Sequence, residues 1–482
     1  MKNSVTGSKV VSSFLWVLIE KFGYSGISLL STLALARLLS PYEFGLVGSV
    51  AIITSISNML VESGMGAALV NKENTTEKDY NTVFTFNLSM SCFLYALIFI
   101  AAPFIAGYFG NPVIKDIIRV LSLSLIINAF TLVQRTILIK NLLFKKQSFI
   151  ALFSLSLSVI VSVFMAYQGW GVWAIVAQLL LYAAIYSVTI FFIIRYIPKI
   201  HFSFSSFKEL LGFGGRIILS SAIQVGYNDI ISSVIAKIYS IQTTGLYTQS
   251  KKLISFPVNI FRSLFDIAAF PILSKIKDKE EFAKMCSQIN RGIYLLAFPL
   301  LLVIPFNTQE IIKIVLGNQW LEANTIFSIL SVGVLILLIE IAAFNILKSS
   351  GNAKSYLRIG IYRAMIGFSM LLITFSFSLE VLLLGIILTN LLVSIITISK
   401  VNTTTAYKVK SQLKDIGYPL IIAVLANVIA LFIVKFVETD QDIIKLLLHI
   451  VFMLFIFLGF CYMLKVKELN FVIKKMNRRR NG

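Results

Sequence analysis

The feature that most constrains this chain is a succession of long apolar runs separated by short polar segments. Each run has about 20 residues, enough for a helix to cross the roughly 30 Å hydrocarbon core of a bilayer. The pattern therefore predicts an all-α polytopic membrane protein with about 14 transmembrane helices. The expected spans are 11–39, 43–69, 81–108, 114–138, 148–167, 172–197, 207–238, 242–272, 289–315, 320–348, 354–377, 379–400, 415–437 and 441–464.

The composition supports a membrane location. Hydrophobic residues make up 57% of the 482 residues and charged residues 13%, about half the usual soluble share of about 25%. A soluble protein of this size could not remove so much apolar surface from water, whereas a protein that faces lipid has no need to do so. The loops between the runs are too short to fold as separate soluble domains.

The net charge of +21 raises the question of a nucleic-acid partner. The basic residues flank the apolar runs instead of forming a soluble face, so we expect no nucleic-acid partner, and the lipid bilayer as the surrounding medium. When the loops are assigned alternately to two sides, roughly thirty basic residues gather on one side and roughly seven on the other. This bias predicts a multi-pass protein of the bacterial inner membrane with both termini in the cytoplasm, which requires an even number of spans.

The residues that would support catalysis or metal binding do not form recognisable motifs. The three cysteines include no CxxC pair, and His201 and His449 stand apart from other ligand residues. No HExxH, P-loop or triad signature occurs in the sequence. We therefore expect no enzyme activity, no catalytic residues, no metal site and no cofactor.

An internal repeat relates two segments at an offset of 200 residues, ALARLLSPYEFGLVGS at 34–49 and VIAKIYSIQTTGLYTQ at 234–249. The matched pairs are Ala36 and Ala236, Arg37 and Lys237, Ser40 and Ser240, Gly45 and Gly245, and Leu46 and Leu246. The repeat pairs spans one and two with spans seven and eight, so the two halves run in the same direction, as in parallel-repeat transporters. It predicts a first six-helix lobe at 1–200, a second at 201–405, and at 406–482 two further helices with a basic cytoplasmic tail.

The segment ARLLSPYEFGLVG, its partner AKIYSIQTTGLYTQSKKL, the later Phe270 and Pro271, and the fourteen spans together resemble the Wzx-type oligosaccharide flippases. These form the polysaccharide-transporter branch of the MOP superfamily, which also holds the MATE exporters and the lipid II flippases. The resemblance implies a MOP/MATE-like fold with two six-helix lobes around a central cavity. It implies that an undecaprenyl-pyrophosphate-linked oligosaccharide, a repeat unit of O-antigen, capsule or exopolysaccharide, crosses from the inner to the outer leaflet by alternating access. The partners would be this lipid-linked oligosaccharide and the glycan polymerase and glycosyltransferases of its pathway.

Charged residues inside the predicted spans are candidates for the transport site. A charge at bilayer depth costs about 3 kcal/mol or more unless it faces a partner or a watery cavity, so such residues are usually functional. We predict a cationic cavity that binds the pyrophosphate, with Arg as a bidentate ligand of phosphate oxygens and Lys as a point charge. Its candidate residues are Lys21, Arg216, Lys251, Lys252, Arg262 and Arg363.

Acidic residues in the spans could couple transport to a proton or sodium gradient. The candidates are Glu20, Asp229 and Glu340. The alternative for each charged residue is a structural ion pair that holds helices together, such as Lys21 with Asp229 or Arg262 with Asp266. The sequence leaves both interpretations open for any single residue.

Three other functions compete with an oligosaccharide flippase. A MATE-like drug exporter should have an acidic lumen, whereas the excess here is basic. A lipid II flippase is disfavoured by the repeat motifs and not by charge. A membrane-embedded glycan polymerase or glycosyltransferase needs catalytic residues on a sizeable outer loop, and the predicted outer loops are short.

Overall fold

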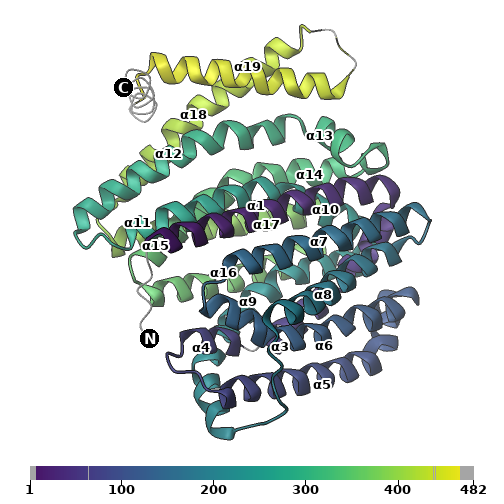
Figure 1. The fold of residues 1–482 in the computed structure, drawn as a ribbon. Helices are drawn as coiled ribbons and strands as arrows, with labels where there is room; N and C mark the ends of the chain where they lie inside the picture. The colour runs from purple at the N-terminus through teal and green to yellow at the C-terminus, as the bar shows by residue number, and fades with distance from the viewer. Residues whose placement is uncertain (1–6, 63, 438, 440, 467–482) are drawn as a thin grey trace. The chain divides into compact units, whose positions relative to one another are not determined.

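The computed structural model describes residues 7–62, 64–437, 439 and 441–466, and every regular element within these ranges is a helix (Figure 1). Two compact units divide the chain at Thr248 and Gln249, inside helix α10. The first unit contains α1 Gly7–Leu38, α2 Pro41–Ser49, α3 Ala51–Glu62, α4 Met65–Asn71, α5 Glu77–Phe109, α6 Val113–Lys140, α7 Phe144–Tyr167, α8 Val172–Ile194, α9 Phe204–Ile238 and the start of α10 Ile241–Leu264.

The second unit begins with the rest of α10, which continues into a short π-helical segment. Its further elements are η1 Phe265–Ala269, α11 Phe270–Leu273, α12 Lys279–Phe306, α13 Thr308–Val315, η2 Asn318–Trp320, α14 Ala323–Val332, α15 Val334–Ser349, α16 Ala353–Thr374, α17 Leu379–Thr404, α18 Val409–Val434 and α19 Asp442–Met463. The predicted all-α membrane fold is thereby confirmed.

Each predicted span coincides with helical structure. Within the described ranges ten helical segments are long and apolar enough to cross a membrane, and an eleventh is the α14–α15 pair, bent by 41°. The other three predicted spans coincide with α1, α9 and α16, which are 32, 35 and 22 residues long. At about 1.5 Å per residue each of these can also cross the bilayer, but each carries several charged residues in its sequence.

Local sequence signals set the ends of α5. At its start, Thr76 and Asp79 form a capping box, in which the Thr76 backbone N–H donates to Asp79 Oδ2 at 2.9 Å and the Asp79 N–H donates to Thr76 Oγ1 at 3.4 Å. These bonds satisfy N–H groups that have no partner inside the helix. At its end, Gly110 adopts the left-handed conformation with φ of 67°, which suits glycine because it has no Cβ.

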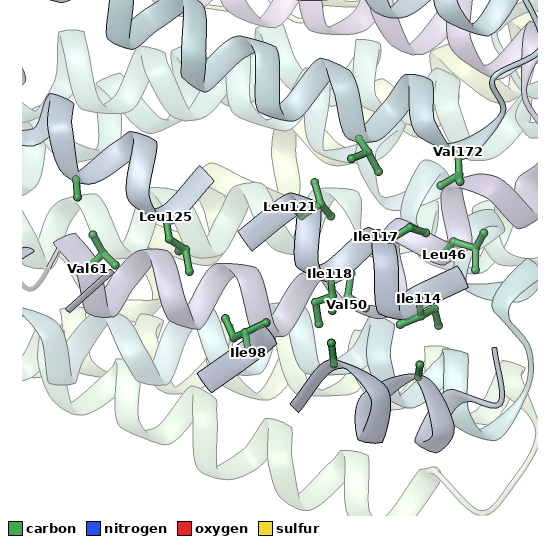
Figure 2. Close-up of a cluster of buried hydrophobic side chains, with 14 residues drawn as sticks. Leu46, Val50, Val61, Ile98, Ile114, Ile117, Ile118, Leu121, Leu125 and Val172 are labelled. Carbon is green, nitrogen blue, oxygen red and sulfur yellow. The ribbon is translucent and has the colours of Figure 1, made fainter. Parts of the chain in front are cut away.

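The first unit is built from helices that pack in a chain of neighbours. α5 packs on α6, α6 on α8, α8 on α7, and α7 on α1. Buried aliphatic side chains of α2, α3, α5, α6 and α8 form its core, which is drawn in Figure 2. The labelled members are Leu46, Val50, Val61, Ile98, Ile114, Ile117, Ile118, Leu121, Leu125 and Val172.

Helix α9 packs against α2, α3, α4 and α5, which explains why it belongs to the first compact unit. The repeat places the same helix at the start of the second predicted lobe, beyond residue 200. The compact units are defined by contacts between residues, whereas the lobes are defined by the sequence repeat. The contacts therefore do not test the lobe boundaries, which stay a prediction.

The second unit has two groups of packed helices. α12 packs on α18, and α18 on α19. α17 packs on α14, α15 and α16, and α15 also packs on α12, which joins the two groups. The described part of the predicted C-terminal segment at 406–482 thus consists mainly of α18 and α19, which cover one side of α12.

Candidate functional site

The charged residues predicted from sequence lie on five helices. Glu20 and Lys21 lie on α1, Arg216 and Asp229 on α9, Lys251, Lys252 and Arg262 on α10, Glu340 on α15, and Arg363 on α16. The Arg216 side chain lies outside the described residues. The candidates on α1 and α9 belong to the first compact unit, and those on α10, α15 and α16 belong to the second.

Adjacent Glu20 and Lys21 point in different directions from α1. Glu20 is half-buried and accepts hydrogen bonds from Ser148 Oγ and Gln147 Nε2 of α7, both at 3.3 Å. Lys21 is exposed, as its position about 100° further round the helix requires. Asp229 of α9 is half-buried. The two hydrogen bonds of Glu20 give it a helix-packing role that the sequence did not indicate.

Three candidate cations follow one another along α10. Lys252 and Arg262 are exposed and Lys251 is half-buried. Lys251 and Arg262 are eleven residues apart, which places them on the same face of the helix about 16 Å apart. Pro257 lies between them inside α10. This face therefore carries positive charge at two depths.

Glu340 and Arg363, predicted to act separately, form one ion pair. Arg363 Nη2 contacts Glu340 Oε1, and its Nη1 lies 3.5 Å from Oδ1 of Asn390 on α17. The side chains of Arg363 and Glu340 are 19% and 5% exposed. The pair compensates two charges that would each be costly to bury alone, and it ties α15, α16 and α17 together.

Asp266 has a partner other than the Arg262 considered from sequence. Asp266 Oδ1 lies 3.6 Å from Nζ of Lys348 and accepts a hydrogen bond from Asn345 Nδ2 at 3.2 Å. Lys348 also lies 4.7 Å from the ring centroid of Phe270, a cation–π contact. The group joins η1 and α11 to α15, and sequence spacing could not reveal it because the partners are about 80 positions apart.

A further polar group, which the sequence did not indicate, lies between α12 and α18. Arg291 Nη2 lies 2.6 Å from Asp415 Oδ1, and the Tyr407 hydroxyl donates to Asp415 Oδ2 at 2.7 Å. Burial and the neighbouring Asp415 carboxylate raise the pKa of Tyr407 well above its ordinary value, so the phenol stays protonated and donates. Arg291 and Asp415 lie near the ends of predicted spans, where charges are common, so neither was noticeable in the sequence.

No group of three or more His, Cys, Asp or Glu side chains in the described part of the chain could hold a metal ion. The predicted residues thus comprise exposed cations on α1 of the first unit, exposed cations on α10 in the second, and the compensated Glu340–Arg363 pair between α15 and α16. Exposed cations can attract an anionic ligand, whereas the compensated pairs position helices.

The model of the family described as polysaccharide biosynthesis protein matches residues 34–325. The chain belongs to this family. The match begins in the first copy of the repeat and includes the second, so it confirms the family to which the repeat motifs pointed. The ten helical segments of the described ranges that are long and apolar enough to cross a membrane agree with a multi-pass membrane protein.

Curated relatives of this family member carry related names. The succinoglycan biosynthesis transport protein ExoT of Rhizobium meliloti (strain 1021) is 23% identical over 332 residues, which cover 69% of this chain and 67% of ExoT. The lipopolysaccharide biosynthesis protein WzxC of Escherichia coli (strain K12) is 23% identical over 351 residues, which cover 71% of this chain and 68% of WzxC. The first name assigns ExoT to the biosynthesis and transport of succinoglycan, and the second assigns WzxC to lipopolysaccharide biosynthesis.

Solved structures with the same fold belong to membrane transporters. The lipid II flippase MurJ in its inward closed conformation matches with a TM-score of 0.76 and 16% identity, over 93% of this chain and 99% of MurJ. An inward-facing MATE family transporter of the MOP superfamily matches with a TM-score of 0.58 and 14% identity, over 83% of this chain and 99% of the transporter. The chain therefore has the same fold as these transporters.

Proposed function

We propose that the protein flips an undecaprenyl-pyrophosphate-linked oligosaccharide from the inner to the outer leaflet of the bacterial cytoplasmic membrane. The observation that carries this proposal is the presence of exposed cations deep in the spans of a polysaccharide biosynthesis protein. Lys21 lies 14 residues into α1, about 21 Å along its axis. Arg262 lies 11 residues from the end of the span Ile241–Leu273, about 16 Å.

An anionic cargo explains why these charges are present. A lysine or arginine exposed at such depth is costly in lipid and is stabilised by water or by an anion. A pyrophosphate offers several oxygens to bidentate arginine, while its polyprenyl chain can stay in the bilayer. Lys251 and Lys252 of α10 and Arg216 of α9 are the further cations that we propose to bind the pyrophosphate. Arg363 would contribute after release from Glu340.

The energy source we propose is a proton or sodium gradient. Asp229 and Glu340 are the acids that we propose to bind the coupling ion, with Glu20 as a third candidate. We also propose that both termini are cytoplasmic and that the glycan polymerase and glycosyltransferases of the same pathway act before and after the protein.

Purified protein in liposomes tests the proposal directly. A fluorescent polyprenyl-pyrophosphoryl oligosaccharide is added to the outer surface, and its movement to the inner leaflet is followed by protection from a membrane-impermeant quencher. Arg262→Gln and Arg216→Gln should each lower the initial rate roughly tenfold or more, since a charge-assisted hydrogen bond contributes about 1.5–3 kcal/mol. Lys199→Gln is the matched control, because Lys199 is an exposed cation in the loop between α8 and α9.

Two results would contradict the proposal. Wild-type rates in both arginine variants would show that the cations do not bind the cargo. Preferential transport of lipid II over the oligosaccharide-bearing carrier would assign the protein to a different transport function.

A further inference from the structure

A line of polar and aromatic side chains joins α1 and α8 in the first unit. Gln178, Tyr182 and Tyr186 follow each other at intervals of four residues, so they lie on one face of α8. On α1, Ser31 and Tyr24 face this line. Ser31 Oγ donates to Gln178 Oε1 at 3.1 Å, and the rings of Tyr24 and Tyr182 meet edge to face with centroids 6.1 Å apart.

The contacts have the register of two antiparallel helices. Ser31 pairs with Gln178, Tyr24 pairs with Tyr182, and the rings of Tyr182 and Tyr186 are 6.0 Å apart. Glu20 lies one turn before Tyr24 on the same side of α1. We call these six residues the α1–α8 polar face.

The tyrosines of the α1–α8 polar face lie further from the helix ends than the tyrosines that anchor membrane proteins at the lipid headgroups. Tyr182 lies ten residues into α8, about 15 Å along the helix, and Tyr24 lies 14 residues from the end of α1, about 21 Å. Tyrosines that anchor membrane proteins lie instead at the level of the lipid headgroups. Tyr24 keeps 40% of its surface exposed and Gln178, Tyr182 and Tyr186 are half-buried, so helix packing closes the face only at Ser31, which is 1% exposed.

The chemistry of this face matches a sugar. One face of a pyranose ring presents C–H groups that pack on an aromatic ring, while its hydroxyls need donors and acceptors at the rim. Tyrosine supplies both a flat apolar surface and a hydroxyl, and Gln178, whose Oε1 accepts from the buried Ser31 hydroxyl, adds its amide N–H groups as donors.

We propose that the α1–α8 polar face is the subsite that binds the sugar rings of the cargo. This inference rests on the proposed function, because it assigns the part of a lipid-linked oligosaccharide that lies beyond the pyrophosphate. The cations bind the pyrophosphate, and the tyrosines bind the glycan by stacking. The face would accept different sugars, since stacking depends on ring shape more than on the position of each hydroxyl.

The test compares two carriers bound by the purified full-length protein in detergent: a short-chain polyprenyl pyrophosphate and the same carrier bearing a trisaccharide. The ratio of their dissociation constants isolates the contribution of the sugar. The wild type should bind the sugar-bearing carrier about tenfold or more tightly, as two or three good contacts would give. In Tyr24→Leu and Tyr182→Leu, which keep apolar volume but lack a ring face, the ratio should fall to about one.

Conservative variants guard against misfolding. Tyr24→Phe and Tyr182→Phe keep the ring and should keep most of the ratio, whereas a Leu variant that had misfolded would lose both carriers together. Tyr167→Ala is the matched control, because Tyr167 is an exposed tyrosine at the end of α7, away from this face. A wild-type ratio of one, or an unchanged ratio in the Leu variants, would overturn the inference. Normal binding without flipping in liposomes would overturn the proposed function instead.

Discussion

Gly45 and Gly245 lie against each other's helix so closely that neither position has room for a side chain. A Cβ on Gly45 would lie 1.7 Å from the carbonyl oxygen of Ile241, and a Cβ on Gly245 would lie 1.8 Å from that of Pro41. The contact is reciprocal at an offset of 200 residues, as expected for two equivalent segments that meet across a two-fold axis. The internal repeat is thus a direct contact between the starts of α2 and α10.

Gly45→Ala and Gly245→Ala should each destabilise the protein strongly. The obstacle is backbone, which cannot move aside as a flexible side chain can, so the cost should reach or exceed about 3 kcal/mol, the upper end for overpacking. Thermal unfolding in detergent, followed by intrinsic fluorescence, would measure the loss. Gly107→Ala is the control, since a Cβ there meets nothing within 4 Å. Wild-type melting in both variants would show that the two segments do not approach so closely.

The Glu340–Arg363 pair leads to a double-variant prediction. Arg363→Gln leaves the Glu340 carboxylate buried without its counter-charge and should cost about 3–5 kcal/mol. Glu340→Gln with Arg363→Gln should recover most of this loss, because two neutral amides carry no buried charge. The melting temperatures of the two single variants and the double variant measure the coupling. A double variant no more stable than Arg363→Gln would contradict a direct pair.

The flipping rate of the double variant then distinguishes a structural role of Arg363 from a role in binding the pyrophosphate. If the arginine only holds α16 to α15, the refolded double variant transports the carrier at a rate close to the wild type. We expect a reduced rate, because the proposed function gives Arg363 a share in binding the pyrophosphate. Unimpaired transport would remove Arg363 from the site and leave it a structural residue.

The sequence was sufficient to predict the helices and the repeat because both depend on short-range patterns. Apolar length identifies a span regardless of its neighbours, and the Gly45–Gly245 match is visible at one fixed offset. The serines before these helices also repeat: Ser40 Oγ donates to Glu43 at 3.0 Å, and Ser240 Oγ accepts from the Thr243 N–H at 2.9 Å. Such caps are local, so sequence spacing reveals them.

The pairing of charged residues could not be predicted because it depends on which helix faces meet. Asp266 has Arg262 four residues before it in the same chain segment, yet it contacts Lys348 on another helix. Glu340 and Arg363 received separate roles because nothing in the spacing indicates that α15 and α16 turn these side chains toward each other. An intramembrane charge is easily found in a sequence, but its partner is a tertiary property.

Asp415 should be the residue on which the packing of α18 against α12 depends most. Its side chain is 1% exposed and has Arg291 and Tyr407 as partners. Asp415→Ala leaves the Arg291 charge without its carboxylate and should cost about 3–5 kcal/mol, whereas Tyr407→Phe removes one hydrogen bond and should cost about 1–3 kcal/mol. Limited proteolysis of the 405–408 connection and thermal unfolding would rank the variants. Equal stability of the two variants would contradict this order.

Lys140, at the end of α6, caps the C-terminus of the short helix α4. Its Nζ contacts the carbonyl oxygen of Lys72, donates to that of Leu69 at 3.3 Å, and lies 3.0 Å from Thr75 Oγ1. Carbonyl groups at a helix end have no partners inside the helix, and a cation there also interacts favourably with the helix dipole.

Lys140→Met keeps the length of the side chain but removes its charge and its donors. The carbonyls of α4 would then lose partners in a part-buried place, at a cost of about 1–3 kcal/mol. Hydrogen exchange of 65–76 should accelerate in this variant, while exchange in the middle of α6 should stay unchanged, because the lysine is at the very end of that helix. Lys146→Met, which changes an exposed lysine in the first turn of α7, should leave both regions as they are. Faster exchange throughout α6 in Lys140→Met would mean that the lysine stabilises its own helix and not the end of α4.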